Sequence, residues 1–398
     1  MAKYRFGDIC KVLNGRAYKQ NELLASGKYP ILRVGNFFSS DRWYYSDMEL
    51  PEDKYCDYED LLFAWSASFG PKIWDGEKVI YHYHIWKLIP NDDIADKWYL
   101  YYWLRHSVNR LTAGTHGSVM AHMTKGDMEN QSIELPSLQT QRKISSILRT
   151  IDEKIHNNVA INNNLLEQIK TICTAWLSEY KPFDGVMPSD WVETPLSDIA
   201  EFISGYSYKG TELTDSTIAM ATIKNFDRKG GFKLDGYKEI IPSSKLKESQ
   251  HAELFDTLVA HTDLTQNAEV IGNAELVMSK SGYDDIVFSM DLVKVLPKKD
   301  GVSKFLIAAI LQDKKFKAHC LGYVNGTTVL HLSKKALPEY KLFLPSDFST
   351  LKPLDEVVTA LYKQVSSNIS ENTYLEELRE SLLPKLMSGE LDVSNIEL

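Results

Sequence analysis

The chain has 398 residues, of which 43% are hydrophobic and 25% charged, an ordinary composition for a globular protein. Its length favours two domains over one, and either half is long enough to bury a core of its own. The formal net charge of −9 argues against a strongly basic protein that binds nucleic acid alone. More than half of this charge lies in residues 371–398, which contain seven acidic and two basic residues. The acidity therefore weakens a DNA-binding interpretation without excluding it.

The sequence contains no recognisable membrane or export signal. Its longest apolar run covers residues 305–311, much shorter than the ~20 residues that a membrane-spanning helix needs. The first eight residues lack the apolar core of a signal peptide. The four cysteines are far apart and form no Cys-x-x-Cys pair, so neither a disulfide framework nor a zinc site is indicated. We expect a cytoplasmic protein with no bound metal.

The two halves of the chain resemble each other in order. The segments 6–10 and 15–19 recur 190 residues later at 196–200 and 205–209. Further matches pair 34–37 with 223–226, 60–64 with 256–260, and 117–123 with 326–332. The offset grows to about 210, as expected if the second copy carries loop insertions. The sequence thus predicts an internal repeat.

Within each copy the pattern predicts a mixed α+β domain. Short alternating segments at 29–34, 79–86 and 291–296 are typical of strands. Residues 96–111 and 303–321 are typical of helices, and the turn-rich stretch 181–188 marks a boundary. We place the first globular domain at 1–136, a helix at 137–181, the second domain at 182–346, a second helix at 347–390 and a tail at 391–398.

Each copy ends in a long helical pattern with a seven-residue apolar repeat. The first stripe includes Ile144, Ile151, Asn158 and Asn162, and the second includes Leu361, Asn368, Asn372 and Leu375. The two asparagines fall at equivalent places, which favours packing of the two helices against each other because buried asparagine pairs fix register. The predicted fold class is therefore α+β, with two similar domains separated by two long helices that pack against each other as a coiled coil.

Common catalytic motifs are absent. The sequence has no phosphate-binding loop, no Gly-x-Gly, no His-Glu-x-x-His and no Gly-x-Ser-x-Gly. His82 and His84 could place two imidazoles on one strand face, but packing or surface roles are far commoner for such residues. Glu339-x-Lys341 resembles the end of a nuclease motif whose upstream Pro-Asp is missing. We expect no catalytic residue in this chain.

Several loops mix polar, basic and glycine residues, as surfaces that read bases and hold phosphates do. They recur at equivalent points of the two copies, at 65–72 and 112–118 in the first and at 261–267 and 322–328 in the second. A single loop of this kind is usually a solvated turn, but the recurrence favours function.

Two segments resemble the conserved regions of the specificity subunits of type I restriction-modification enzymes. Leu135-Pro136-Ser137-Leu138-Gln139-Thr140-Gln141-Arg142-Lys143-Ile144 resembles the central region of that family, and Leu382-Leu383-Pro384-Lys385-Leu386-Met387-Ser388-Gly389-Glu390-Leu391 resembles its C-terminal region. Ser137 stands where the family has a second proline, and Thr140 where it has a glutamate. The second copy, at 344–348, lacks the glutamine altogether.

The resemblance implies a non-catalytic reader of double-stranded DNA. Each domain would be a target-recognition domain for one half of an asymmetric bipartite site. The helices would form an antiparallel coiled coil, set the unread spacer and dock two methyltransferase subunits, which bind S-adenosylmethionine. Motor-endonuclease subunits would join the larger complex. This chain itself would bind no cofactor. Its acidity is compatible with DNA binding if the partner subunits supply much of the phosphate contact.

The candidate interface residues follow from the loops, from the repeat and from the resemblance. For the partner-binding helices we select the eight stripe residues named above. The candidate DNA-binding residues are Lys19, Lys72, Gly117, Ser118, His122 and Lys125 in the first copy, and Lys209, Thr265, Gln266, Asn267, Gly326, Thr327, His331 and Lys334 in the second.

Two other functions stay open from the sequence. The net charge is also compatible with a protein–protein scaffold that carries two adaptor domains on a coiled-coil strut. A stand-alone nuclease or methyltransferase is the least favoured, because its motifs are missing.

Overall fold

The structure is a computed structural model that describes residues 1–38, 42–66, 68–112 and 123–396. The chain divides into two compact units. The first unit comprises Met1–Lys154 and Leu375–Leu398, and the second comprises Ile155–Tyr374. Each unit therefore contains one globular domain and a segment of each long helix.

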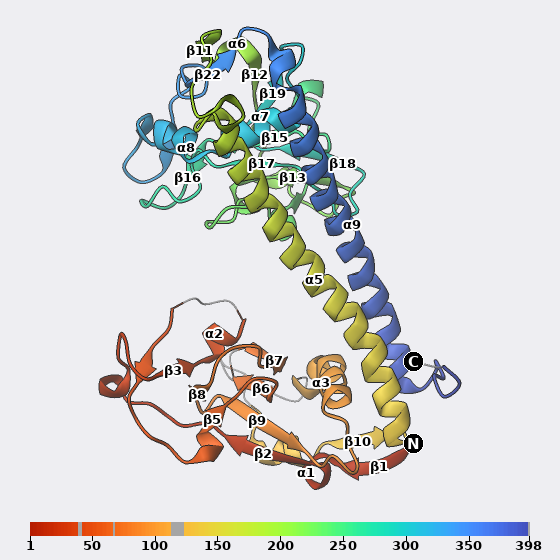
Figure 1. Cartoon of the computed structure of the whole chain (residues 1–398). Coiled ribbons are helices and arrows are strands. Elements are labelled where there is room, and N and C mark those ends of the chain that lie inside the picture. The colour runs from red at the N-terminus through yellow and green to blue at the C-terminus, as the bar shows by residue number, and fades with distance from the viewer. Residues whose placement is uncertain (39–41, 67, 113–122, 397–398) are drawn as a thin grey trace. The chain divides into compact units, whose positions relative to one another are not determined.

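Two four-stranded sheets and one strand pair build the first unit (Figure 1). One sheet has the order β2(Cys10–Asn14), β9(Ile85–Pro90), β6(Leu61–Ser66), β7(Ser68–Ile73), with antiparallel neighbours throughout. The other has the order β4(Tyr45–Ser46), β3(Tyr29–Leu32), β8(Val79–Tyr81), β5(Tyr55–Cys56), and its β3–β8 pair is parallel. The antiparallel pair is β1(Ala2–Arg5) with β10(Ser132–Leu135).

The second unit repeats this plan. Its four-stranded sheet has the order β12(Ala200–Ser204), β19(Leu292–Pro297), β15(Thr257–Ala260), β17(Ala274–Leu276). A second sheet has three strands in the order β14(Lys238–Glu239), β13(Ile218–Ala221), β18(Asp285–Phe288), and its β13–β18 pair is parallel, as β3–β8 is in the first unit. The strand pair is β11(Trp191–Pro195) with β22(Lys341–Pro345). A further sheet has the order β16(Thr262–Asp263), β21(Leu330–Leu332), β20(Val324–Asn325).

The matching strand order confirms the internal repeat, but two strand predictions were wrong. The segment 79–86 is not one strand: β8 ends at Tyr81, residues 82–84 form a turn, and β9 begins at Ile85. Apolar residues alternate on both sides of this turn, so the two-residue period continues through it. The segment 29–34 ends as a strand at Leu32, and helix α2 begins at Val34.

Short helices close the cores of both units. Phe6, Phe63, Trp86, Tyr99 and Leu104 are almost fully buried in the first. In the second, every residue from Phe305 to Leu311 is buried. The predicted helix 303–321 is in fact two helices, because Asp313 caps a new one and its side chain accepts a hydrogen bond from the backbone N–H of Lys315. The helices are α1(Phe6–Ile9), α2(Val34–Phe38), α3(Lys97–Thr112), α4(Lys125–Glu129), α6(Leu196–Ile199), α7(Lys304–Leu311) and α8(Lys314–Leu321).

Glu275, on β17, makes the stability of the second unit depend on pH. Its carboxylate accepts a hydrogen bond from the backbone N–H of Gly231 at 2.7 Å. Burial raises the pKa of Glu275 from 4.5 to about 7, against the opposing effects of that hydrogen bond and of Lys170. The folded unit therefore holds a proton that the unfolded chain releases between these two values, and stability falls as the pH rises through this window.

The substitution Glu275→Gln is expected to remove this pH dependence. The amide keeps an acceptor for Gly231 and cannot ionise. We expect the variant to be more stable than the natural chain at pH 8, by up to about 3 kcal/mol, and about equally stable near pH 4. Urea unfolding at several pH values measures this, and parallel pH profiles for the two proteins would contradict it.

The first long helix, α5(Leu138–Leu177), begins at a local hydrogen-bond network. The Ser137 hydroxyl accepts a hydrogen bond from the backbone N–H of Thr140 at 3.2 Å, as a helix cap does. Gln141 is buried; its amide group donates to the carbonyl oxygens of Ile94 and Pro136 and accepts from the N–H of Asp96. The serine and threonine that depart from the family pattern thus form a cap, and the glutamine fixes the helix start to the domain.

The second long helix, α9(Lys352–Ser388), runs beside α5 (Figure 1). Asn158 donates a hydrogen bond to Asn372 at 2.8 Å, and Asn368 donates one to Asn162 at 2.7 Å. The partner numbers rise on one helix as they fall on the other, so the helices are antiparallel. Each asparagine pairs with the repeat counterpart of its neighbour. The predicted α+β fold with two domains and two mutually packed helices is confirmed.

A single substitution in an asparagine pair is expected to cost more than a double one. Replacing Asn162 with leucine leaves the buried Asn368 amide without its acceptor, which costs about 1–3 kcal/mol of unfolding free energy. The double change Asn162→Leu with Asn368→Leu replaces both polar groups by apolar ones and should recover most of this loss. Urea unfolding of both variants tests this, and a double variant less stable than the single one would contradict it.

Across the described part of the chain, the structure has no helix with the length and apolar character that a membrane span requires.

Candidate nucleic-acid interface

In each unit a glycine lies in very close contact with the backbone of a distant segment, at one end of the four-stranded sheet that contains β2 or β12. We call this contact the glycine crossing. In the first unit, a Cβ on Gly15 would lie 2.4 Å from the carbonyl oxygen of His82. In the second, a Cβ on Gly205 would lie 2.0 Å from the carbonyl oxygen of Ser289. Only glycine allows this approach. It brings the segment after β2 or β12 against the turn that precedes β9 or β19.

Lys19 and Lys209 follow these glycines at equivalent positions. Each precedes a short 3₁₀ turn, and its backbone N–H donates to the carboxylate of Glu22 or Glu212, at 2.8 Å and 2.7 Å. Both side chains are exposed. The structure therefore gives the two predicted lysines the same local setting, next to the glycine crossing.

Four rings gather at the crossing in the first unit. We call this set, Trp65, His82, Tyr83 and His84, the ring cluster. The Tyr83 ring centre lies 4.5 Å from that of His82 and 4.0 Å from that of His84. Trp65 stacks on Trp86 at 5.5 Å, and its Nε1–H donates to the carbonyl oxygen of Tyr83 at 2.8 Å. The turn is thereby held rigidly while Tyr83 stays 38% exposed.

Positive charge adjoins the ring cluster. Arg33 and Arg42 lie over the ring of Tyr44, at 5.1 Å and 5.3 Å from its centre. Burial, together with the charges of His84 and Arg33, lowers the pKa of His82 to about 4. His82 is therefore uncharged at neutral pH. Exposed aromatic rings interleaved with arginine are typical of nucleic-acid interfaces.

In the second unit, Asp263 organises the loop that contains Thr265, Gln266 and Asn267. One carboxylate oxygen accepts from the backbone N–H and the hydroxyl of Thr265, both at 2.8 Å. The other accepts from the N–H of Val270 at 2.8 Å. Gln266 then donates to the carbonyl oxygen of Thr327 at 2.7 Å, which ties this loop to the one with Gly326. Three predicted residues, Thr265, Gln266 and Thr327, are thus brought together.

His331 and Lys334 lie at the same end of the second unit, near His261. His331 is on β21, paired with Thr262 on one side and Asn325 on the other, and is exposed. Burial lowers the pKa of His261, and the charges of His331 and Lys334 lower it further, whereas Asp291 raises it. This end of the second unit therefore combines basic, imidazole and amide groups around the Ser289–Asp291 turn.

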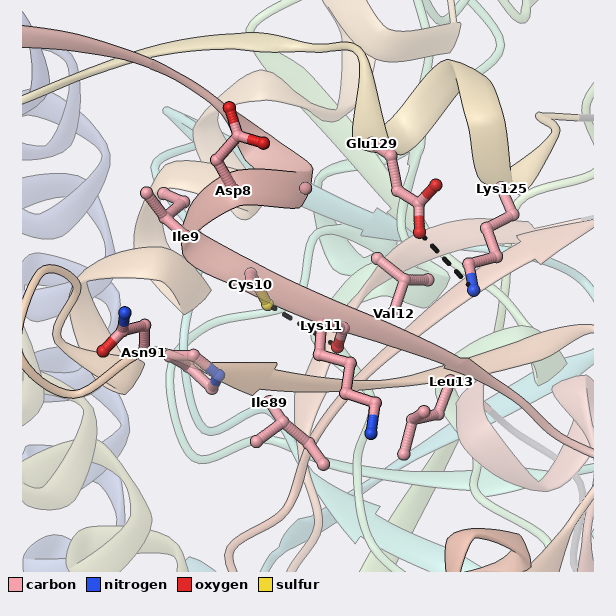
Figure 2. A pocket seen from close by; sticks show the side chains of 12 residues that line it. Asp8, Ile9, Cys10, Lys11, Val12, Leu13, Ile89, Asn91, Lys125 and Glu129 are labelled. Carbon is pink, nitrogen blue, oxygen red and sulfur yellow. Dashed lines mark hydrogen bonds and ion pairs between the residues drawn. The ribbon is translucent and has the colours of Figure 1, made fainter.

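Lys72 and Lys125 differ from the other predicted lysines because each has an acidic partner. Lys72 lies 3.5 Å from Asp75 and over the ring of Trp74. Lys125 pairs with Glu129 at 3.4 Å on the rim of a surface pocket that Lys11 and Leu13 also line (Figure 2). Gly117, Ser118 and His122 lie outside the described residues.

The helix residues selected as partner contacts lie mostly inside this chain. Ile144, Ile151, Asn158, Asn162 and Asn368 are buried, and Leu361, Asn372 and Leu375 are half-buried. Their side chains pack the helices together and against the domains. The helices also carry exposed apolar side chains, among them Val159, Ile161 and Tyr374.

The weaker catalytic candidates gain no support. His82 and His84 lie on a turn and not on one strand face. Among the residues that the structure describes, no group of three or more His, Cys, Asp or Glu side chains could hold a metal ion. Glu339 accepts a hydrogen bond from Tyr323, and Lys341 pairs with Glu193.

The sequence reasoning missed Arg33, Tyr83 and Asp291. The signal for Tyr83 was present, because Tyr81-His82-Tyr83-His84 is an unusual aromatic run. A strand interpretation of this run makes His82 and His84 the metal-site candidates and gives Tyr83 no role. Asp291 carried no sequence signal, since its place beside His261 depends on the fold.

Comparisons with known proteins agree with this architecture. A family model for the type I restriction modification DNA specificity domain matches residues 1–170. The specificity subunit of the type I restriction enzyme MjaVIII from Methanocaldococcus jannaschii is 23% identical over 352 residues, which are 85% of this chain and 80% of that protein. The MjaIX specificity subunit of the same organism is 22% identical over 335 residues, 78% of this chain and 72% of that protein.

A solved structure shares the fold. The S subunit of a type I restriction-modification system from M. genitalium has a TM-score of 0.57 and 15% sequence identity, over 97% of this chain and 95% of that one. The family model covers the first copy, the repeated strand order extends the same plan to the second, and the relatives span most of the chain. The first copy thus matches the type I restriction modification DNA specificity domain, and most of the chain is similar to specificity subunits of type I restriction-modification systems.

Proposed function

We propose that this chain reads DNA for a type I restriction-modification complex, with each unit recognising one half of an asymmetric bipartite site. The observation that carries this proposal is the doubled scaffold. The four-stranded sheets with β2 and with β12 have the same strand order, and both units have the same glycine crossing, yet the side chains at that crossing differ. Two readers built on one plan with different surfaces suit two different half-sites.

The proposed DNA surface is the end of each domain that contains the glycine crossing. In the first unit it offers Lys19, Arg33 and the ring cluster. In the second it offers Lys209, Gln266, His331 and Lys334. Basic side chains hold phosphates, whereas amide, imidazole and aromatic groups contact base edges. Lys72 and Lys125, which have acidic partners, contribute less.

The helix pair is proposed to set the spacer and to dock two methyltransferase subunits. Both helices run without interruption through both units, which supports a fixed register. Val159, Ile161 and Tyr374 are exposed apolar side chains on this pair and offer contact area to another subunit. S-adenosylmethionine would belong to the methyltransferase, and motor-endonuclease subunits would complete the assembly. No catalytic step is assigned to this chain.

The test is assembly of the full chain with its methyltransferase partner, followed by binding to DNA of known sequence. We expect specific affinity that falls steeply with salt, since phosphate contacts release counterions. The matched variants are Lys209→Gln and Lys298→Gln: both lysines are in the second unit, but Lys298 follows β19 at the end opposite the crossing. Lys209→Gln should reduce the salt slope by about one and Lys298→Gln should leave it unchanged. A complex without salt-dependent DNA binding would instead favour the scaffold function.

A further inference from the structure

The turn before β9 and the turn before β19 have the same backbone hydrogen bonds. The backbone N–H of Tyr83 donates to the carbonyl oxygen of Arg16 at 3.0 Å, and that of Met290 donates to the carbonyl oxygen of Tyr206 at 2.9 Å. The backbone N–H of Ile85 donates to the carbonyl oxygen of His82, and that of Leu292 donates to the carbonyl oxygen of Ser289, both at 2.9 Å. Residues 82–84 and 289–291 are therefore equivalent, and we call them the first and second crossing turns.

The side chains on the two turns differ completely. The first carries His82, Tyr83 and His84, and the second carries Ser289, Met290 and Asp291. The middle residue is exposed in both, Tyr83 by 38% and Met290 by 57%. The residue that hydrogen-bonds to the last residue of each turn also differs. The backbone N–H of Trp65 donates to the carbonyl oxygen of His84, and that of His261 donates to the carbonyl oxygen of Asp291. An unchanged backbone with variable exposed side chains is what a specificity-determining element requires.

Rigidity gives the first crossing turn a defined surface. The rings of His82 and His84 contact the ring of Tyr83, and the hydrogen bond from Trp65 holds the backbone carbonyl oxygen of Tyr83. The backbone N–H of His84 donates to Nδ1 of His82 at 3.4 Å, so the proton of the uncharged His82 is on Nε2. The turn thus offers one apolar ring face, a phenol hydroxyl and imidazole groups, which suit a thymine methyl and the acceptor atoms of purines.

The second crossing turn has the opposite chemistry. The carboxylate of Asp291 accepts hydrogen bonds and donates none. In the major groove, carboxylates accept from the exocyclic amino groups of bases. A half-buried carboxylate beside the exposed Met290 therefore selects a base that carries such a group and disfavours one that presents only acceptors.

We infer that the two crossing turns determine sequence specificity, the first for one half-site and the second for the other, with the Asp291 carboxylate accepting from the amino group of cytosine or adenine. This inference rests on the proposed function, because it needs each unit to read DNA. It adds which residues choose the bases and which base class the second turn takes.

The experiment uses the complex of the full chain with its methyltransferase partner. The motif is first determined for the natural complex by methylation sequencing of a randomised DNA library. It is then determined for Tyr83→Ala and Asp291→Asn. The matched controls are Tyr58→Ala, at the opposite end of β6 from Trp65, and Asp300→Asn, beyond the opposite end of β19 from Asp291. Should a variant fail to assemble, Tyr83→Phe and Asp291→Glu replace it.

The expected result is a change confined to one half-site per variant. Asp291→Asn should relax or change one base pair in one half-site, with discrimination at that position reduced by about tenfold or more. Tyr83→Ala should do the same in the other half-site, and the controls should keep the natural motif. Natural motifs and rates within about twofold for both variants would overturn the inference while leaving the proposed function standing. A natural complex that methylates no bipartite motif would overturn both.

Discussion

Replacing Asp263 with asparagine is expected to destabilise the second unit by about 3–5 kcal/mol. The Asp263 side chain is buried, and its two oxygens accept hydrogen bonds from Thr265, Val270 and Ile271. Asparagine keeps one oxygen and turns the other acceptor into an N–H₂ group that faces N–H donors. The loop that carries Gln266 and Asn267 would then lose its internal support.

The pKa of Asp263 also predicts how its contribution to the stability of the second unit changes with pH. Burial raises this pKa, but the hydrogen bonds from Thr265 and Val270 outweigh burial and lower it below its usual range. Because its pKa is lower in the folded state, Asp263 stabilises the folded unit at pH values above 3.8, the pKa in the unfolded chain. This stabilisation is lost as the pH falls through the pKa of the folded state. Asp263→Asn should therefore remove part of the acid sensitivity of the second unit.

Urea unfolding and hydrogen exchange measure these effects. Amides 264–271 should exchange faster in Asp263→Asn, and the assembled complex should lose affinity for one half-site. Asp300→Asn, which changes an exposed carboxylate in the same unit, is the control. An unfolding free energy within about 0.5 kcal/mol of the natural chain would show that the loop does not depend on Asp263.

The second large effect is expected in the first unit, at Asp152 on α5. One of its oxygens accepts from the Tyr102 hydroxyl at 2.7 Å, and the other accepts from the guanidinium of Arg379 on α9. The Arg379 side chain is only 13% exposed. Replacing Asp152 with alanine leaves the buried Tyr102 hydroxyl without its acceptor and leaves the largely buried Arg379 guanidinium with only the exposed Glu380 as an acidic partner, which should cost about 3 kcal/mol.

A double variant distinguishes the loss of the Asp152–Arg379 ion pair from the loss of packing by the Arg379 side chain. Replacing Arg379 with methionine in the Asp152→Ala background removes a largely buried charge whose remaining partner, Glu380, is exposed, so the double variant should be more stable than Asp152→Ala alone. Urea unfolding of the natural chain and the two variants gives the comparison. A double variant that is less stable than the single one would show that the Arg379 side chain contributes by packing and not by its ion pair.

The repeat and the helix pair could be predicted because each leaves a regular mark on the sequence. Gly15 and Gly205 are required by the backbone crossing, so they appear at matching places in the two copies. The asparagines of both stripes pair with each other, and their spacing followed the seven-residue period. Arg379 interrupts the second stripe, and only the structure shows its partner, Asp152.

The crossing turns could not be recognised from the sequence, because their role depends on contacts distant along the chain. Tyr83 looked like one more residue in an alternating strand, since a tight turn without glycine or proline leaves the alternation intact. Lys72 and Lys125 were selected by residue type, but their partners Asp75 and Glu129 reduce the positive charge that they can offer to phosphates. Charge pairing of this kind is set by side-chain geometry, which residue spacing alone does not give.

The most direct test of the central claim is a methylation map of the source cell's genome with and without this gene. If the chain is the DNA-reading subunit, its deletion should abolish methylation at one asymmetric motif with two specified parts and an unspecified spacer. The same map would give both half-sites and the spacer length. An unchanged map, in a cell that expresses the partner methyltransferase, would contradict the account and favour a scaffold.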